Sequence, residues 1–210
     1  MSDRSVLIVG RLFFGLLTLA AILTQFVVHL RHGFDVVNFF GYFTNLSNIF
    51  AAVVFLAGAV YLLQRREPTQ TENLVRGASV AAMAVVGIVF AILLRDEDLG
   101  TLLPWVNTVL HIIMPVVVVV DWLYAPPKTI LAVRQAGYWL IYPLLYLVYT
   151  LIRGAIVGFY PYPFLNPAKA GGYGVVALYC IAIFVVFLVV SWLLITLGNA
   201  LKRTLSLRAA

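Results

Sequence analysis

Six long apolar runs dominate this sequence and restrict what the chain can fold into. Each run is close to the ~20 residues that an α-helix needs to cross ~30 Å of hydrocarbon. Only 10% of the 210 residues are charged and 63% are hydrophobic, whereas a water-soluble domain carries about 25% charged residues. We therefore expect an all-α integral membrane protein, a bundle of six transmembrane helices that forms one domain over residues 1–210. The expected spans are residues 5–30, 42–64, 76–94, 104–124, 134–158 and 173–198.

Basic residues are distributed unevenly over the segments that join these runs. Nine lie in the N-terminal segment, the second and fourth joins and the C-terminal tail, against three in the other joins, while Arg11 and Arg153 lie inside runs. Because cytoplasmic loops carry the excess of Lys and Arg, we expect both termini to be cytoplasmic. The net charge of +6 then reflects topology and an attraction to anionic membrane lipids, and it predicts no nucleic-acid partner. The short joins, with no targeting additions, favour a bacterial plasma membrane.

Polar side chains interrupt several of the runs at a similar expected depth. In the stretch YFTNLSNIF, residues 42–50, Thr44 and Asn48 are four apart and share one helix face. Asn107 and His111 have the same spacing, and His111 lies about 10 Å past the start of its run at 1.5 Å per residue. With cytoplasmic termini these side chains fall in the outer leaflet, where we expect a buried polar pocket. The full set is Thr44, Asn48, Asn107, His111, Thr150 and Arg153.

The residue types in this layer are those that acyl transfer requires. His111, neutral in a site of low dielectric constant, could remove a proton as a general base. Thr44 could then act as a nucleophile, since a threonine hydroxyl needs an adjacent base. Asn45, Asn48 or a backbone amide could stabilise an oxyanion, and Arg153 could hold a substrate carboxylate.

Two further features complete the predicted site. Asn107 lies one turn from His111 and is a possible orienting residue for the imidazole. The stretch YPYPF is rigid and amphipathic, and it suits an interfacial rim or lid formed by Tyr160, Tyr162 and Phe164.

Each assignment has a structural alternative. A membrane threonine such as Thr44 commonly bonds a carbonyl one turn back, and asparagines can hold helices together. Arg153 can equally extend to the headgroups. We expect neither a metal nor a cofactor, because three histidines and one cysteine offer few ligands, although a haem bracketed by His29 and His111 stays open.

Three stretches, YFTNLSNIF, NTVLHIIMPVVVVVDWLY and YPYPFLN, resemble the androgen-induced and ADTRP family of multi-pass membrane proteins. Characterised members of that family are threonine hydrolases that cleave fatty acid esters of hydroxy fatty acids. The resemblance implies that Thr44 is the nucleophile and that His111, followed by Pro115 and Asp121, is the catalytic histidine. Its late motif corresponds to residues 162–164.

The expected function is therefore hydrolysis of a lipid ester within the membrane, by a Thr44 nucleophile and a His111 base. The alternative is a small membrane transporter or lipid-binding protein that uses the same polar pocket. A third possibility is an assembly subunit whose polar residues only join helices. The expected partners are a lipid ester substrate and membrane lipids, and the sequence leaves the oligomeric state open.

Overall fold

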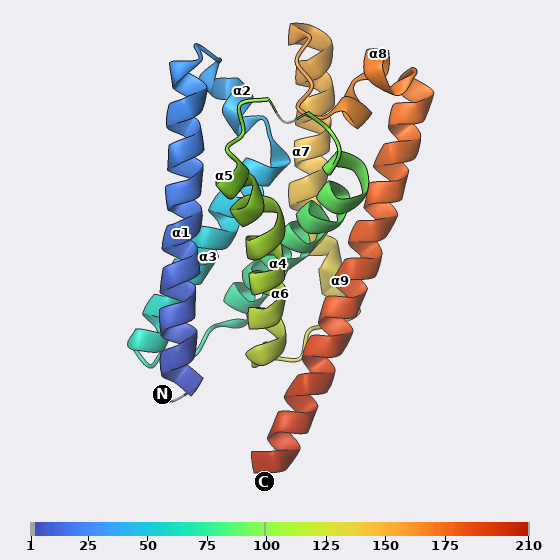
Figure 1. Cartoon of the computed structure of the whole chain (residues 1–210). Helices are drawn as coiled ribbons and strands as arrows, with labels where there is room; N and C mark the ends of the chain where they lie inside the picture. The colour runs from blue at the N-terminus through green and yellow to red at the C-terminus, as the bar shows by residue number, and fades with distance from the viewer. Residues whose placement is uncertain (1–2, 99, 210) are drawn as a thin grey trace.

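The computed structural model describes residues 3–98 and 100–209, and the regular structure of those residues is helical. The six expected apolar helices are confirmed, and they indicate an integral membrane protein. In Figure 1 the six helices form one bundle, and the N and C marks lie at the same end of it. We call this end the termini end and the other the far end. The helices long and apolar enough to cross a membrane are Asp3–Arg31, Phe43–Leu63, Gln70–Leu94, Pro104–Tyr124, Val133–Val157 and Tyr173–Thr204.

Several of these spans consist of more than one helical element. The first three spans and their join contain α1 (Asp3–Arg31), α2 (Val36–Phe40), α3 (Phe43–Leu63), α4 (Gln70–Val89) and the π-helical turn η1 (Phe90–Leu94). The fourth contains α5 (Pro104–Thr108), the π-helical turn η2 (Val109–Ile113) and α6 (Met114–Tyr124). The remainder comprises η3 (Val133–Gln135), α7 (Ala136–Val157), η4 (Pro163–Leu165), α8 (Pro167–Ala170) and α9 (Tyr173–Ala209).

The helix ends agree with the expected spans except at α4 and α9. α4 begins at Gln70, six residues before the expected start at residue 76, because a capping box starts it. The Thr69 hydroxyl accepts from the Glu72 N–H (3.2 Å), and the Glu72 carboxylate accepts from the Thr69 N–H (2.8 Å). This first turn is polar, so hydropathy alone does not reveal it. α9 continues past the expected end at residue 198 to Ala209.

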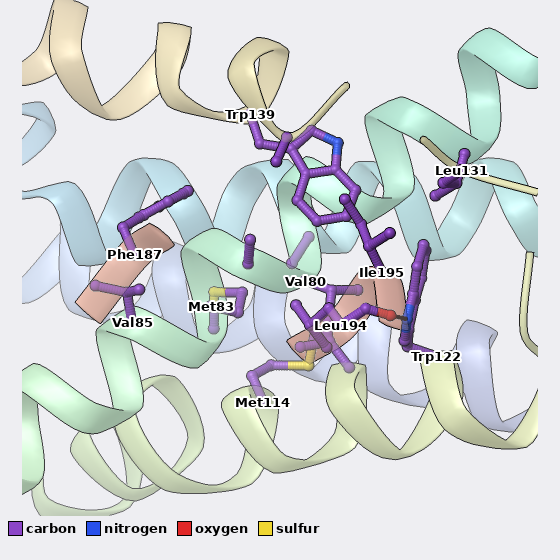
Figure 2. Close-up of a cluster of buried hydrophobic side chains, with 14 of the residues drawn as sticks. Val80, Met83, Val85, Met114, Trp122, Leu131, Trp139, Phe187, Leu194 and Ile195 are labelled. Atoms are coloured by element: carbon purple, nitrogen blue, oxygen red, sulfur yellow. Dashed lines mark hydrogen bonds between the residues drawn. The ribbon is translucent and has the colours of Figure 1, made fainter. Parts of the chain in front are cut away.

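α4 is the central helix of the bundle. It contacts α3, α6, α7 and α9, and 56% of its most apolar stretch is buried, against 11% for the fifth span. Figure 2 shows side chains of the surrounding helices meeting around it, with the Trp139 indole beside the α4 ribbon. Gly77 permits that approach, since a Cβ there would lie 2.0 Å from Trp139. Trp122 belongs to the same group of buried side chains, and its Nε1–H donates to the Leu194 carbonyl (2.9 Å), which joins α6 to α9.

A buried group of three charged residues joins α1, α4 and α6 toward the termini end. The Asp121 carboxylate accepts from Arg11 Nε (2.8 Å) and from Arg76 Nη2 (2.7 Å). The side chains of all three residues are largely buried. Three helices that are distant in sequence are therefore fixed to one another by one carboxylate.

Candidate functional site

Thr44 lies in the first turn of α3, at the far end of the bundle. Two side-chain contacts fix this part of the chain. The Asp35 carboxylate caps the short helix α2 by accepting from the Val37 N–H (2.7 Å), and the Asn45 amide donates to the Phe39 carbonyl at the other end of α2 (2.8 Å). Asn45 thus holds α2 against α3, and Thr44 is 6% exposed beside it.

His111 lies in the π-helical turn η2, four residues before Pro115. Because proline has no N–H, the regular helical ladder cannot continue through this position, and the Met114 N–H bonds to the Val109 carbonyl in a π-type pattern. The carbonyl of Leu110 is thereby free to accept another donor. It accepts from the Asn48 amide (3.1 Å), which also donates to the Thr44 carbonyl (2.9 Å). Asn48 therefore connects α3 to the distorted turn that carries His111.

The imidazole of His111 is held on two sides. Its ring stacks on Phe90 of η1, with centroids 4.3 Å apart. Gly87 permits this close packing of the third and fourth spans, because a Cβ there would lie 2.9 Å from Pro115. His111 Nδ1 lies 3.3 Å from the Asn107 carbonyl oxygen. Since a carbonyl oxygen only accepts, this contact requires the hydrogen on Nδ1, and in the neutral imidazole the free lone pair is then on Nε2.

Tyr162 lies at the centre of the site. Its hydroxyl oxygen accepts from the Thr44 N–H (3.1 Å) and exchanges a hydrogen bond with Thr44 Oγ1 (3.2 Å). The ring stacks on Phe164, with centroids 5.2 Å apart. Burial raises the pKa of Tyr162 to about 12, so the phenol is neutral at physiological pH and keeps its proton for donation.

Two hollows meet at Thr44 and Tyr162. A cavity of about 450 Å³ lies at the far end and is lined by both residues together with His111. We call it the polar cavity, because other polar side chains such as Gln25 and Glu97 also line it. An apolar pocket of about 110 Å³ lies between α3, α4, α7 and α9, and Thr44 and Tyr162 line it as well. The Thr44 hydroxyl therefore lies where an apolar compartment joins a polar one. Thr44 and His111 face the same polar cavity and make no direct hydrogen bond with each other.

The wall of the polar cavity also carries acidic and neutral polar groups. Glu97 and Asp98 line it, whereas the described residues that line it include no Lys or Arg. The Gln25 amide closes one side, since it donates to the Thr101 carbonyl (3.0 Å) and accepts from the Leu103 N–H (3.1 Å). The cavity is thus suited to a neutral or cationic group rather than to an anion.

Six of the predicted residues do not line the polar cavity, namely Asn48, Asn107, Thr150, Arg153, Tyr160 and Phe164. Thr150 is a buried residue of α7. Arg153 donates to Asn38 Oδ1 (2.7 Å) and lies over the Phe159 ring, so it stands behind a wall that Asn38 and Phe159 form. Asn107 contacts His111 through its backbone, and its buried side-chain oxygen has no partner among the described residues. Asn48 makes the interhelical contacts given above.

The predicted rim residues have three different positions. The Tyr160 ring packs against Gly154, where a Cβ would lie 2.2 Å from it. Phe164 lines the apolar pocket, and Tyr162 contacts Thr44 directly. Sequence reasoning missed this role of Tyr162, since a loop between two helices carries no periodicity that fixes where its side chains point. Gln25 was also missed, although a polar residue inside an apolar run was a detectable signal.

Among the described residues, no group of three or more His, Cys, Asp or Glu side chains is placed to hold a metal ion. In comparisons with protein families, curated proteins and solved structures, the chain gave no significant match.

Proposed function

We propose that this protein hydrolyses lipid esters within the membrane, with Thr44 as nucleophile and His111 as general base. The observation that supports this most strongly is the position of Thr44, whose side chain is shared by an apolar pocket and by the polar cavity that contains His111. An ester lipid has the same division, with an acyl chain on one side of its carbonyl and a more polar group on the other. A transporter would require neither this junction nor a nucleophile at it.

In the proposed reaction Thr44 Oγ1 attacks the ester carbonyl carbon while its proton passes to His111 Nε2. The tetrahedral intermediate collapses, the bond to the alcohol oxygen breaks, and the imidazolium returns the proton to that alcohol. Water then attacks the acyl-threonine with the same base and releases the fatty acid. Since Thr44 and His111 are not hydrogen-bonded to each other, the proton transfer requires either a bridging water or closure around the substrate.

Tyr162 is the donor best suited to the oxyanion. The side-chain amides of Asn45 and Asn48 already donate to the carbonyls of Phe39, Thr44 and Leu110. The Tyr162 hydroxyl instead accepts from the Thr44 N–H and has its own proton to donate next to the nucleophile. A neutral phenol in a buried site can stabilise developing negative charge.

The acyl chain is proposed to enter sideways from the lipid. Leu144 of α7 and Phe184 of α9 line the apolar pocket, and both are also exposed on the outside of the bundle. The opposite part of the substrate would occupy the polar cavity, where Glu97 and Asp98 oppose a free carboxylate. We therefore favour esters with a neutral or cationic polar group over those with a carboxylate, and Arg153 has no direct role in this proposal.

The proposed location is the plasma membrane of a bacterium, with the termini in the cytoplasm and the site in the outer leaflet. The unequal distribution of basic residues between the two ends supports this orientation.

A fluorophosphonate probe tests the nucleophile directly. The purified protein is treated with the probe and the adduct is located by peptide mass spectrometry, with Thr44→Ala and His111→Ala as test variants. Thr108→Ala and His32→Ala are matched controls, because Thr108 bonds only the Pro104 carbonyl on the exposed side and His32 lies outside the cavity.

We expect an adduct on Thr44 in the parent and in both controls, and none in the two test variants. Labelling that persists in Thr44→Ala would exclude Thr44 as the nucleophile. A folded parent protein that is never labelled, yet binds ester lipids, would instead favour a lipid-binding protein.

A further inference from the structure

A second polar cavity, of about 460 Å³, lies at the termini end of the bundle, far from the proposed hydrolytic site. It is bounded by the start of α1, the end of α3, the start of α4 and the segment after α6. We call it the basic cavity, because six cationic side chains line it. They are Arg4, Arg11, Arg65, Arg66, Arg76 and Lys128.

Carboxylates offset only half of this charge. Lys128 pairs with Glu67 (2.7 Å) and Arg66 pairs with Glu72 (2.7 Å), and both acids also line the cavity. The third carboxylate is Asp121, which is shared by two arginines. The described lining therefore carries three more positive charges than the carboxylates bonded to it can neutralise.

One of the excess charges is buried. Arg11 and Arg76 share the single carboxylate of Asp121, and Arg11 is only 9% exposed. Its Nε and Nη2 groups donate to Asp121, while Nη1 makes no hydrogen bond to the described residues. Nη1 lies against Gly58, another lining residue, where a Cβ would approach it to 2.9 Å. A buried guanidinium with a free donor and no full counter-charge is costly unless an anion completes its shell.

Arg65 is a second cation of this cavity, and its backbone has the left-handed conformation that non-glycine residues rarely adopt. It is the one described non-glycine residue with a positive φ, +55°, and it follows the end of α3. Glycine is preferred at such a position because it has no Cβ. Here the chain carries an arginine, and it lines the cavity. Arg4 lines the same cavity, and its guanidinium donates to the Leu62 carbonyl.

A tendency to keep cations on the cytoplasmic side does not account for this arrangement. Such a tendency is satisfied by exposed residues such as Arg134, whereas here the cations surround one cavity and one of them is buried. Several guanidinium groups facing one space are the arrangement that binds phosphate, since each presents a planar fork of N–H donors. The volume exceeds that of a phosphate and leaves room for the group that carries it.

We propose that the basic cavity binds a phosphate group, carried either by the headgroup of an anionic phospholipid or by a soluble phosphate compound. The phosphate oxygens accept from Arg11 Nη1 and from Arg65, and the excess charge of the Arg11–Asp121–Arg76 group is neutralised. The site is independent of Thr44 and His111, so it stands whether or not the protein is a hydrolase.

Calorimetric titration of the whole protein in uncharged detergent tests the proposal and separates the two sources. Three probes are used: dioctanoyl phosphatidic acid, dioctanoyl phosphatidylcholine and inorganic phosphate. The test variants are Arg11→Gln and Arg65→Gln. Arg11→Gln leaves Asp121 paired with Arg76, so the fold is retained, and Arg65→Gln changes an exposed side chain. The matched control is Arg134→Gln, which removes one exposed cation elsewhere at the termini end.

We expect saturable binding of phosphatidic acid that weakens about tenfold in each test variant, the size of one lost charge-assisted hydrogen bond, and is unchanged in Arg134→Gln. Binding of phosphatidic acid without inorganic phosphate assigns the site to a lipid headgroup, and equal binding of both assigns it to a soluble phosphate. Equal weakening of phosphatidic acid binding in all three variants would show a general attraction to the charged surface and would overturn the proposal. The proposal is also overturned if phosphatidic acid does not bind, or if phosphatidylcholine binds as tightly as phosphatidic acid.

Discussion

At the scale of single residues, Tyr162 illustrates what depth along a helix can and cannot predict. Counting residues correctly brought Thr44 and His111 to one cavity, because helical rise fixes the depth of each side chain. It did not predict that Tyr162 would return from a loop and bond Thr44 at 3.2 Å. Nor did it predict that the Arg153 guanidinium would donate to Asn38 Oδ1, since depth does not fix the direction in which a side chain points.

Removing the Tyr162 hydroxyl tests its proposed role. In Tyr162→Phe we expect kcat for ester hydrolysis to fall about a hundredfold, the usual effect of losing one oxyanion donor, while the folded structure is retained. Steady-state kinetics and circular dichroism measure the two effects. The control is Tyr142→Phe, which breaks a bond to Ser47 outside both hollows. Equal activities of these two variants would remove Tyr162 from the mechanism.

The shared carboxylate of Asp121 leads to a prediction about stability. Asp121→Asn leaves two buried guanidinium groups without a counter-charge, and we expect a loss of about 3–5 kcal/mol in the free energy of unfolding. Denaturant unfolding in detergent measures it. Glu67→Gln breaks an ion pair whose side chains are 65% and 67% exposed, and we expect no measurable loss there. Similar stabilities of the two variants would contradict the importance we assign to the buried group.

At the scale of elements, the sequence predicts the helices better than their local distortions. Apolar runs place the spans well, whereas the fourth span is irregular before Pro115, where the missing N–H interrupts the helical ladder. The π-helical form of η2 and the matching turn η1 could not be predicted, because they depend on how Phe90, His111 and Asn48 pack together. Such turns often accompany functional sites.

Close packing of α4 and α7 depends on one glycine. Gly77→Ala places a Cβ 2.0 Å from the Trp139 ring, and we expect a destabilisation of about 1–3 kcal/mol from overpacking. Gly137→Ala is the matched change in α7, where a Cβ meets nothing within 4 Å, and it should not lower stability because alanine favours the helix. Thermal unfolding of both variants measures these effects. If Gly77→Ala unfolds at the same temperature as the parent protein, the Trp139 indole moves aside easily and the predicted overpacking is wrong.

At the scale of the whole molecule, the sequence predicts a six-helix membrane bundle because composition and run length leave few other folds. It does not predict that α4 is central, since its span is not the most apolar one, with a mean hydropathy of 2.5 against 2.9 for the last span. It predicts a buried polar pocket but not the apolar pocket that meets it at Thr44, because the apolar pocket arises from packing between α3, α4, α7 and α9.

The orientation of the bundle can be measured with single cysteines. After Cys180→Ser removes the only native cysteine, Arg134→Cys and Lys169→Cys place one exposed thiol at each end. In intact bacterial cells an impermeant maleimide should label Lys169→Cys and leave Arg134→Cys unlabelled until the cells are opened. The reverse pattern would place the termini outside.

The bond between Arg11 and Asp121 spans 110 residues of chain, and this separation has a consequence for biosynthesis. The first span leaves the ribosome with a guanidinium in its apolar stretch and no partner, since the carboxylate belongs to the fourth span. Until that later span is made, the earlier helix lacks its final neighbour and depends on the insertion machinery or on water to solvate the charge. We therefore expect α1, which is synthesised before α6, to complete its native packing only after α6 has been made.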